Sequence, residues 1–251
     1  RQPGGGFGGG ALELPDTVLE RGFLLLALAA QGLEILRLLL ETPEIPSLGY
    51  RTLTLAPVPG PLPVAASELA VSPHSLESPF HRIALDEKGR IVSLLDKRAG
   101  REVLPPGAIA NQFQAFEDRP RVPDAWDIDV YYDDRWWPAE STAEVRVVES
   151  GPLRACLEVR RRILSSDLVQ RISLARGSRR LDFDTIVEWR ERHILLKVAF
   201  PLNVLAPAAT YEIQWGNVER PTHRNTSWDW ARFEVPAQKW ADLSEGGYGA
   251  S

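Results

Sequence analysis

Apolar and polar residues alternate along most of the chain after residue 42, and turn-forming residues interrupt this alternation at short intervals. In "HRIALDEKGRIVSLLD" the alternation includes Ile83 and Leu85, stops at "DEKG" and resumes at Ile91. A period of two is typical of a half-buried strand, and two such runs around a short turn with glycine predict a β-hairpin. We therefore expect a hairpin over residues 80–95 that turns at residues 87–89.

The same pattern predicts further antiparallel strands between residues 143 and 220. The alternating segments are broken by "ESGP" and "ARGS" and again near Arg192. In "ATYEIQWGNVE" the alternation places Tyr211, Ile213 and Trp215 on one face. No long helix is predicted after residue 42, so we expect residues 75–251 to be mainly β, in the two packed sheets of a sandwich.

The first part of the chain predicts a smaller β unit. "RGFLLLALAAQGLEILRLLLE" is interrupted by Gln31, Glu34 and Arg37, so its apolar runs are shorter than the about 20 residues of a membrane-spanning helix. "AAQGLE" predicts a turn between two buried strands, and a buried amphipathic helix is the alternative. We expect a flexible lead-in over residues 1–10, a small β unit with a strand centred on "YRTLTL" and a Pro-rich linker over 11–72, and the sandwich over 73–251.

Composition narrows the functional classes. The 29 Lys and Arg residues are scattered among 34 Asp and Glu residues and give a net charge of -5, which disfavours nucleic acid as a partner. The single cysteine, Cys156, allows no internal disulfide and is expected to be an inert core residue. A chain without methionine is expected to be a piece of a longer protein.

No segment suits secretion or a membrane partner, so a cytoplasmic location is expected. The histidines also fail to form a metal motif. None is followed two residues later by aspartate, and no His-x-x-x-His pair or Gly-x-Ser-x-Gly elbow is present. We therefore expect neither a cofactor nor a metal ion in this chain. The histidines are His74, His81, His193 and His223.

Acidic and aromatic residues are concentrated in "DAWDIDVYYDDRWWP", residues 124–138. Carboxylates act as acid or nucleophile in glycosidases, and flat rings stack on sugar faces. On a strand, Asp127 and Asp129 would share a face, with their Cα atoms about 6.5–7 Å apart. Three roles remain open: ion pairing with nearby arginines beside a buried Trp126, a sugar-facing wall, and direct catalysis. A second such stretch, "ERPTHRNTSWDWARFEVPAQKWADLSEGGYG", is expected to be an ordered loop held by its own polar contacts.

Four segments together resemble the C-terminal β region of bacterial-type α-mannosidases of glycoside hydrolase family 38. They are "SPFHRIALDEKGRIVSLLDKRAGREVL", "NQFQAFEDRPRVPDAWDID", "RRLDFDTIVEWRERHILLKVAFPL" and "VERPTHRNTSWDWARFEVPAQKWADLSEGGYG". The resemblance implies a mainly β fold, a galactose-mutarotase-like β-sandwich (supersandwich) preceded by a small antiparallel β unit. Because the β region of that family extends further, the resemblance also implies that the sandwich is truncated at the C-terminal end of this chain, which favours self-association through bare strand edges. In that family the zinc ligands and the nucleophilic aspartate belong to an N-terminal barrel and helical region, which this chain lacks.

The resemblance therefore implies a non-catalytic role. The chain would support and rim the catalytic barrel of a retaining, zinc-dependent α-mannosidase, with its own N-terminal catalytic domain as partner. α-Mannoside glycans would be met through the full enzyme, and the zinc would be held in the catalytic domain. The substrate-rim candidates are Asp118, Asp124, Trp126, Asp127 and Asp129.

Two other classes of function stay open. An independent carbohydrate-binding β-sandwich module would also combine acids, arginines and aromatic rings without a catalytic set. A free-standing mutarotase-like enzyme would need a histidine and a carboxylate in one cleft. Glu191 and His193 are the pair that the sequence offers for that chemistry.

Overall fold

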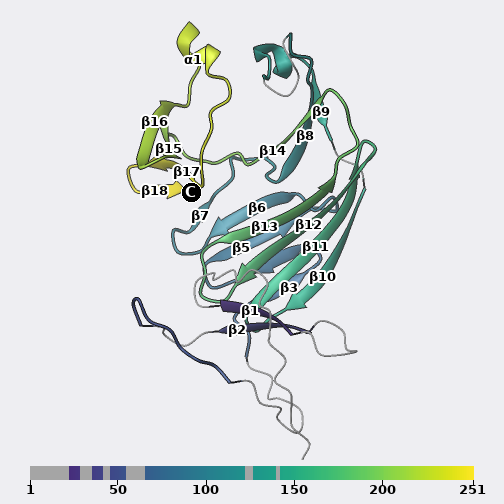
Figure 1. Ribbon diagram of the computed structural model, residues 1–251, viewed down its shortest axis with the longest axis vertical. Helices are drawn as coiled ribbons and strands as arrows, with labels where there is room; N and C mark the ends of the chain where they lie inside the picture. The colour runs from purple at the N-terminus through teal and green to yellow at the C-terminus, as the bar shows by residue number, and fades with distance from the viewer. Residues whose placement is uncertain (1–22, 29–35, 42–45, 55–65, 122–126, 140–141) are drawn as a thin grey trace, which may run out of the picture. The chain divides into compact units, whose positions relative to one another are not determined.

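The computed structural model describes the chain outside residues 1–22, 29–35, 42–45, 55–65, 122–126 and 140–141 (Figure 1). The chain divides into two compact units, Arg1–Ala66 and Ser67–Ser251. In the first, β1 (Phe23–Leu28) pairs antiparallel with β2 (Leu36–Glu41), so the strand prediction for residues 21–41 is confirmed and the helix alternative is wrong. Pairing gives the backbone groups of each strand partners in the other. The lead-in and the "AAQGLE" turn lie outside the described residues.

The predicted strand centred on "YRTLTL" is wrong. Residues 50–54 form no strand, and Tyr50 is 89% exposed. A strand requires a neighbour that takes up its backbone N–H and C=O groups, and among the described residues no strand pairs with this segment. Alternation of side chains sets which face a strand would bury, but it does not supply the partner.

The second unit begins with a five-stranded antiparallel sheet. Its order is β3 (Ala70–Ser72), β4 (Ser75–Glu77), β5 (His81–Leu85), β6 (Ile91–Asp96) and β7 (Arg101–Glu102). The predicted hairpin is confirmed as β5 and β6. Its turn is held by the Asp86 carboxylate, which accepts the backbone N–H of Lys88 at 2.9 Å and that of Arg90 at 3.0 Å. Gly89 takes φ +67° there, and a Cβ at this position would lie 2.6 Å from Val159 Cγ1, so the turn requires glycine.

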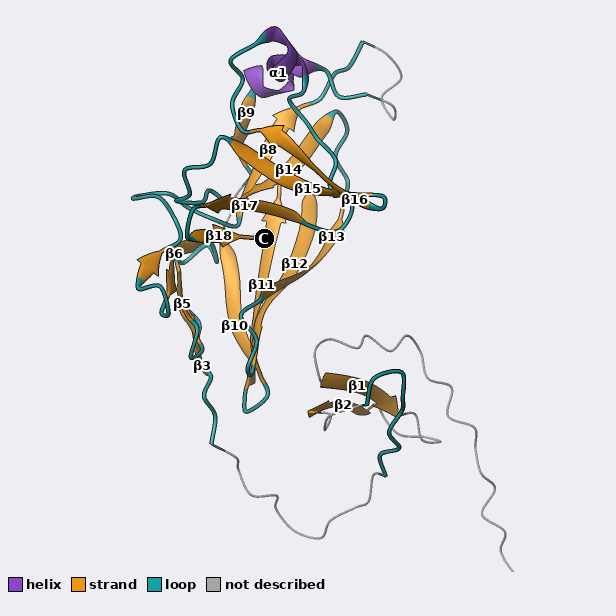
Figure 2. Cartoon of the chain, turned by 90° about the vertical axis from the view of Figure 1, so that its left-hand side faces the viewer, coloured by secondary structure: helices purple, strands orange, loops and turns teal. Residues whose placement is uncertain are grey.

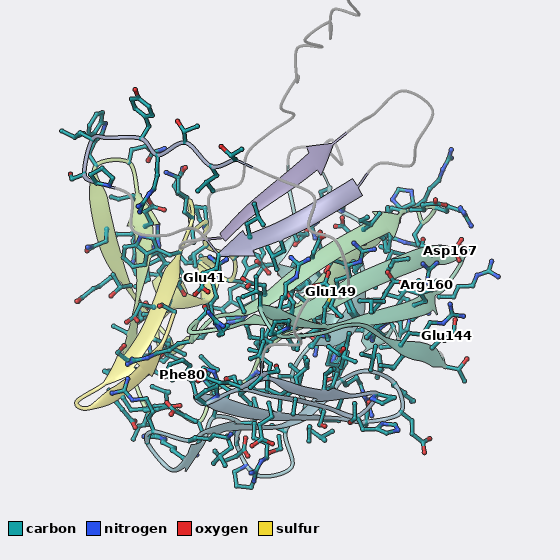
Figure 3. The ribbon with its side chains drawn as sticks, turned by 90° about the horizontal axis from the view of Figure 1, so that it is seen from below. Glu41, Phe80, Glu144, Glu149, Arg160 and Asp167 are labelled. Atoms are coloured by element: carbon teal, nitrogen blue, oxygen red, sulfur yellow. The ribbon has the colours of Figure 1, made fainter. Side chains whose placement is uncertain are left out.

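Three successive hairpins form a four-stranded sheet. Its order is β10 (Ala143–Ser150), β11 (Arg154–Ile163), β12 (Ser166–Ala175) and β13 (Leu181–Glu188), and the predicted breaks at "ESGP" and "ARGS" are confirmed. Alternate residues of β12 from Ser166 to Leu174 are buried, as the period of two requires. Several of the exposed positions of this sheet are occupied by charged residues. Figure 3 shows three of them, Glu144, Arg160 and Asp167, at one end of the sheet.

The main core lies between these two sheets. Leu76, Ile83 and Ile91 of the five-stranded sheet join residues of β11 and β12 in one cluster of fully buried side chains, which includes Leu157 and Ile172. The neighbouring Cys156 is also buried, and burial raises the pKa of its thiol to about 11. The expected core position of this cysteine is therefore confirmed, and its inertness, which the raised pKa favours by leaving little thiolate near neutral pH, stays a prediction.

Two smaller sheets complete the second unit. One has the order β14 (Ile194–Ala199), β8 (Gln112–Glu117), β9 (Trp136–Pro138), and the other β16 (Gly216–Pro221), β15 (Ala208–Ile213), β17 (Ala241–Glu245), β18 (Tyr248–Ala250). The strand predicted to continue through Trp215 is wrong, because β15 ends at Ile213 and Trp215 lies in the hairpin turn with φ +66°. The turn exposes this indole completely.

The mainly β class is confirmed, but the two-sheet prediction is not met, since the described part of the second unit has four sheets. Proline-containing segments lie at two of the changes of sheet, at 104–107 between β7 and β8 and at 200–207 between β14 and β15. Proline has no backbone N–H to donate to a neighbouring strand, so such segments end strand pairing.

The helices in the described part are short, η1 (Val130–Asp134) and α1 (Ser227–Ala231). None of them is long and apolar enough to cross a membrane.

Candidate functional site

The acid and aromatic stretch 124–138 forms a helical turn and a short strand. Asp129 is the N-cap of η1, and its carboxylate accepts the backbone N–H of Tyr131 at 3.4 Å. The expected partner for at least one of Asp127 and Asp129 is thus confirmed, whereas their predicted common strand face is wrong. An aspartate side chain competes for nearby N–H groups and so favours a cap or turn over a strand. Asp127 is exposed, and Asp124 and Trp126 lie outside the described residues.

The remaining rim candidate, Asp118, follows β8. Its backbone N–H donates to the carbonyl of His193 at 2.9 Å, just before β14, and the residue is half-buried. It therefore stands where the β8–β14 pair ends. A rim role for the five candidate residues stays a prediction.

The two stretches that the sequence singles out meet in the fold. The rings of Tyr131 and Trp230 have centroids 6.2 Å apart, and those of Tyr132 and Phe233 are 5.7 Å apart. An Arg224 guanidinium nitrogen lies 3.1 Å from the Asp133 carboxylate. Figures 1 and 2 both show α1 at the same end of the second unit as β9. We call this contact region the acid–aromatic junction; its members are Tyr131, Tyr132, Asp133, Lys197, Arg224, Trp230, Phe233 and Glu234.

Lys197 on β14 connects both sides of the junction. Its Nζ donates to the Tyr132 hydroxyl at 2.7 Å, pairs with the Glu234 carboxylate, and lies 4.4 Å from the centroid of the Tyr132 ring. Burial by itself lowers the pKa of this ammonium, but the hydrogen bonds to Glu234 and Tyr132 outweigh burial and leave the pKa raised. The charged lysine is thus retained between the Glu234 carboxylate and the rings of Tyr132 and Phe116. Sequence reasoning missed it, although a single lysine in the apolar run "HILLKVAF" was a signal.

Replacing Lys197 by methionine is expected to destabilise the chain by about 1–3 kcal/mol, because the stem is retained while the ion pair, the hydrogen bond and the cation–π contact are lost. The free energy of unfolding from urea titration measures the effect. Lys88→Met, in the exposed β5–β6 turn, is the matched control and should change stability by less than about 0.5 kcal/mol. Equal effects of the two substitutions would show that Lys197 holds nothing together.

The second stretch is held by its own polar contacts, as expected, but it is not a loop throughout, since it contains α1, β17 and β18. Thr226 is the N-cap of α1 and accepts the backbone N–H of Asp229 at 3.2 Å, while the Asp229 carboxylate accepts the Thr226 N–H at 3.1 Å and its hydroxyl at 2.8 Å. The Thr226 side chain is the main cause of the lowered pKa of Asp229. Such a capping box serves the helix end. Asp229 is therefore a structural carboxylate.

Exposed aromatic rings lie in the junction and beside it. Trp228 of α1 is 75% exposed, and Tyr131, Trp136 and Trp230 are each exposed by more than about two fifths. Large rings at the surface are costly in water and are typical of contact with sugars or with other protein surfaces. The junction therefore presents rings outward while its carboxylates are engaged inside it.

The described residues do not fit a metal centre. They include no group of three or more His, Cys, Asp and Glu side chains placed to hold a metal ion. Near His223, whose Nδ1 lies 3.5 Å from an Asp229 oxygen, the carboxylate is already part of the helix cap. The zinc implied by the family resemblance thus finds no donor set in this part of the chain.

The carboxylate of the mutarotase-like alternative is also engaged. Glu191 Oε1 accepts the Ser165 N–H at 2.7 Å and the hydroxyls of Ser165 and Ser166 at 2.6 and 2.9 Å. The Ser165 hydroxyl is the main cause of the lowered pKa of Glu191. Because a general base works best with a pKa near the operating pH, this geometry disfavours the Glu191 and His193 pair.

Comparison with known proteins decides the family. Residues 76–251 match the family described as "Glycosyl hydrolases family 38 C-terminal domain". The chain belongs to this family. The family 38 match begins in β4 and includes all four sheets of the second unit except β3.

Curated relatives of this family 38 chain are named as α-mannosidases. It is 41% identical over 216 residues to "Alpha-mannosidase 2C1" of Homo sapiens, which covers 82% of this chain and 20% of that protein. It is 41% identical over 181 residues to "Alpha-mannosidase G" of Dictyostelium discoideum, covering 69% of this chain and 16% of that protein. The chain therefore spans a fifth or less of the length of these relatives. Both are eukaryotic, so the bacterial type stays a prediction.

A solved structure supports the fold. "The crystal structure of an alpha-mannosidase from Enterococcus faecalis V583" superposes with a TM-score of 0.58 at 14% identity, over 72% of this chain and 23% of that one. At this identity the likeness concerns the fold alone.

Proposed function

We propose that this chain is the non-catalytic C-terminal β portion of a retaining, zinc-dependent α-mannosidase, which supports and rims a catalytic barrel encoded elsewhere in the full protein. One observation carries the proposal: the chain matches the C-terminal domain of family 38 over residues 76–251 and spans 20% of a named α-mannosidase. The supersandwich topology and the bacterial type are part of the same proposal.

The geometry of the junction supports a rim role over a reactive one. Asp129 caps η1, Asp133 is paired with Arg224, and Asp229 caps α1. The surface around these carboxylates carries exposed rings, which can stack on a sugar or pack on a neighbouring domain. We place the catalytic domain and the α-mannoside glycan at this face.

Exposed indoles also fit the second candidate, an independent carbohydrate-binding module. The indole of Trp228 is exposed on this chain, where a sugar ring could stack on it. Titration of the chain with mannose and with mannobiose separates the two functions. Saturable binding of either sugar by the chain alone favours the module, and no binding favours the supporting role.

Trp228→Ala is the variant that tests the rim. In the full-length enzyme we expect kcat/KM for an α-mannoside to fall by about fivefold, the equivalent of about 1 kcal/mol of lost ring contact. The matched control is Trp215→Ala, in the β15–β16 turn, where the indole is fully exposed but belongs to neither of the two acid and aromatic stretches. That control should leave kcat/KM unchanged. A rim role for the junction is refuted when both variants behave alike while remaining folded by circular dichroism.

A further inference from the structure

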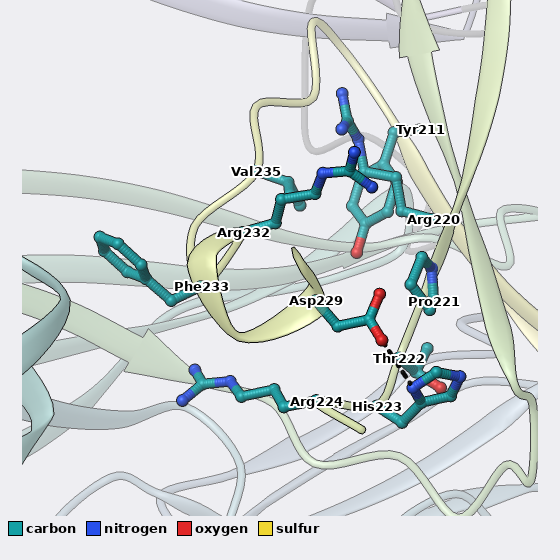
Figure 4. A pocket seen from close by; sticks show the side chains of 10 residues that line it. All are labelled: Tyr211, Arg220, Pro221, Thr222, His223, Arg224, Asp229, Arg232, Phe233 and Val235. Carbon is teal, nitrogen blue, oxygen red and sulfur yellow. Dashed lines mark ion pairs between the residues drawn. The ribbon is translucent and has the colours of Figure 1, made fainter. Parts of the chain in front are cut away.

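A pocket of about 300 Å³ lies beside the junction, between the β15–β16 hairpin and the loop that contains α1 (Figure 4). The hairpin contributes Tyr211 and Arg220, and the loop contributes Asp229 and Arg232. Residues opposite one another in an antiparallel pair share a face, and Arg220 is opposite Ala209 while Tyr211 is opposite Val218. The hairpin thus directs an arginine and a tyrosine to the same wall.

Arg220 has an unsatisfied donor in this wall. Its Nε is buried and has no hydrogen-bond acceptor among the described residues. A buried charged donor without an acceptor costs more free energy than a neutral one, so such groups in proteins normally have a partner. A hydrogen-bond acceptor in the pocket would satisfy this donor, and a negatively charged acceptor would suit it best.

The charges of the pocket do not balance. Three arginines line it, Arg220, Arg224 and Arg232, against the single carboxylate of Asp229. Arg224 is paired with Asp133, outside the lining, and Asp229 is engaged by Thr226. Arg220 and Arg232 therefore share the one negative charge of Asp229, whose pKa Arg232 helps to lower, and the lining keeps an excess of one positive charge. Figure 4 shows both arginine side chains on the side of the pocket where the Tyr211 ring lies.

We infer that this pocket binds an oxyanion of the phosphate or carboxylate class, carried by a small ligand, between Arg220 and Arg232. Two guanidinium groups that line one pocket repel each other, and an anion bound between them would relieve that repulsion. The planar donor fork of each group matches two oxygens of a phosphate or carboxylate. The volume is at the lower end of the about 300–1,000 Å³ of ligand pockets, which suits a monosaccharide derivative or a free anion.

Isothermal titration of the chain at constant ionic strength tests the site. The probes are inorganic phosphate, mannose 6-phosphate, acetate and unmodified mannose. We expect saturable binding of at least one anion at one site, and a raised melting temperature, because a ligand that binds the folded state stabilises it. Tighter binding of mannose 6-phosphate than of inorganic phosphate would assign the site to a sugar phosphate, and equal binding would assign it to the free anion.

Arg220→Gln and Arg232→Gln should each reduce the affinity by about tenfold or more, since each removes a charge-assisted hydrogen bond. Arg98→Gln, an exposed arginine in the β6–β7 turn outside the pocket, removes the same charge and should leave affinity unchanged. Where Arg220→Gln fails to fold, the exposed Arg232 still provides the test. The inference is overturned by the absence of saturable anion binding, by equal losses in Arg98→Gln, or by mannose binding as tightly as the anions.

Discussion

We expect the purified 251-residue chain to leave an aryl α-mannoside unhydrolysed, with or without added zinc. A retaining glycosidase needs two carboxyl groups about 5–5.5 Å apart across the scissile bond. Asp129, Asp133 and Asp229, three of the carboxylates beside the exposed rings, are engaged in helix caps and an ion pair. Release of the coloured aryl product over time, in zinc and in chelator, measures the activity.

The complementary experiment supplies the rest of the enzyme. Adding the N-terminal catalytic region as a separate polypeptide should produce turnover that the chain lacks by itself. Turnover by the chain alone, abolished by chelator and restored by zinc, would contradict the proposed supporting role. The chain without the added region is the control for contaminating glycosidase.

Ile172→Ala is expected to cost about 2–5 kcal/mol in the free energy of unfolding, because it opens a cavity in a densely packed core. Ile172 is 0% exposed and belongs to the cluster that joins the five-stranded and four-stranded sheets. The lost contacts therefore include those that hold the two sheets together. Urea unfolding followed by tryptophan fluorescence measures the change.

The matched control is Ile186→Ala on the neighbouring strand β13. Ile186 is 65% exposed, so the same deletion should change stability by less than about 0.5 kcal/mol. Similar costs at the two positions would show that the interface between the sheets is not the main core of the unit.

The sequence predicted those parts of the fold that depend on neighbouring residues. The β5–β6 hairpin was predictable, since alternation ends at Asp86 and Gly89 supplies the positive φ of the turn. The chain from β10 to β13 was predictable for the same reason, because "ESGP" and "ARGS" separate alternating runs. The period of apolar residues and the residue types that form turns are local properties, so they can be recognised from the sequence alone.

Predictions failed where the outcome depended on a partner or a competing contact. Residues 50–54 alternate like a strand but find none to pair with among the described residues, and Trp215 continues an alternation that the β15–β16 turn interrupts. Asp127 and Asp129 do not lie on a strand. The Asp129 carboxylate accepts the backbone N–H of Tyr131 instead, and η1 begins at this cap. A period of two cannot distinguish these cases.

By itself the sequence determined the mainly β class, the family and the residue types that could contact a sugar, because periodicity and motifs are written in the order of residues. Tertiary structure alone decided which of those residues meet. Asp133 and Arg224 are 91 positions apart in the chain and form an ion pair, and Lys197 joins Tyr132 to Glu234 from a third segment. Such contacts depend on how the sheets pack and how the strands are ordered. The residues next to each partner in the sequence do not indicate which remote segment it will contact.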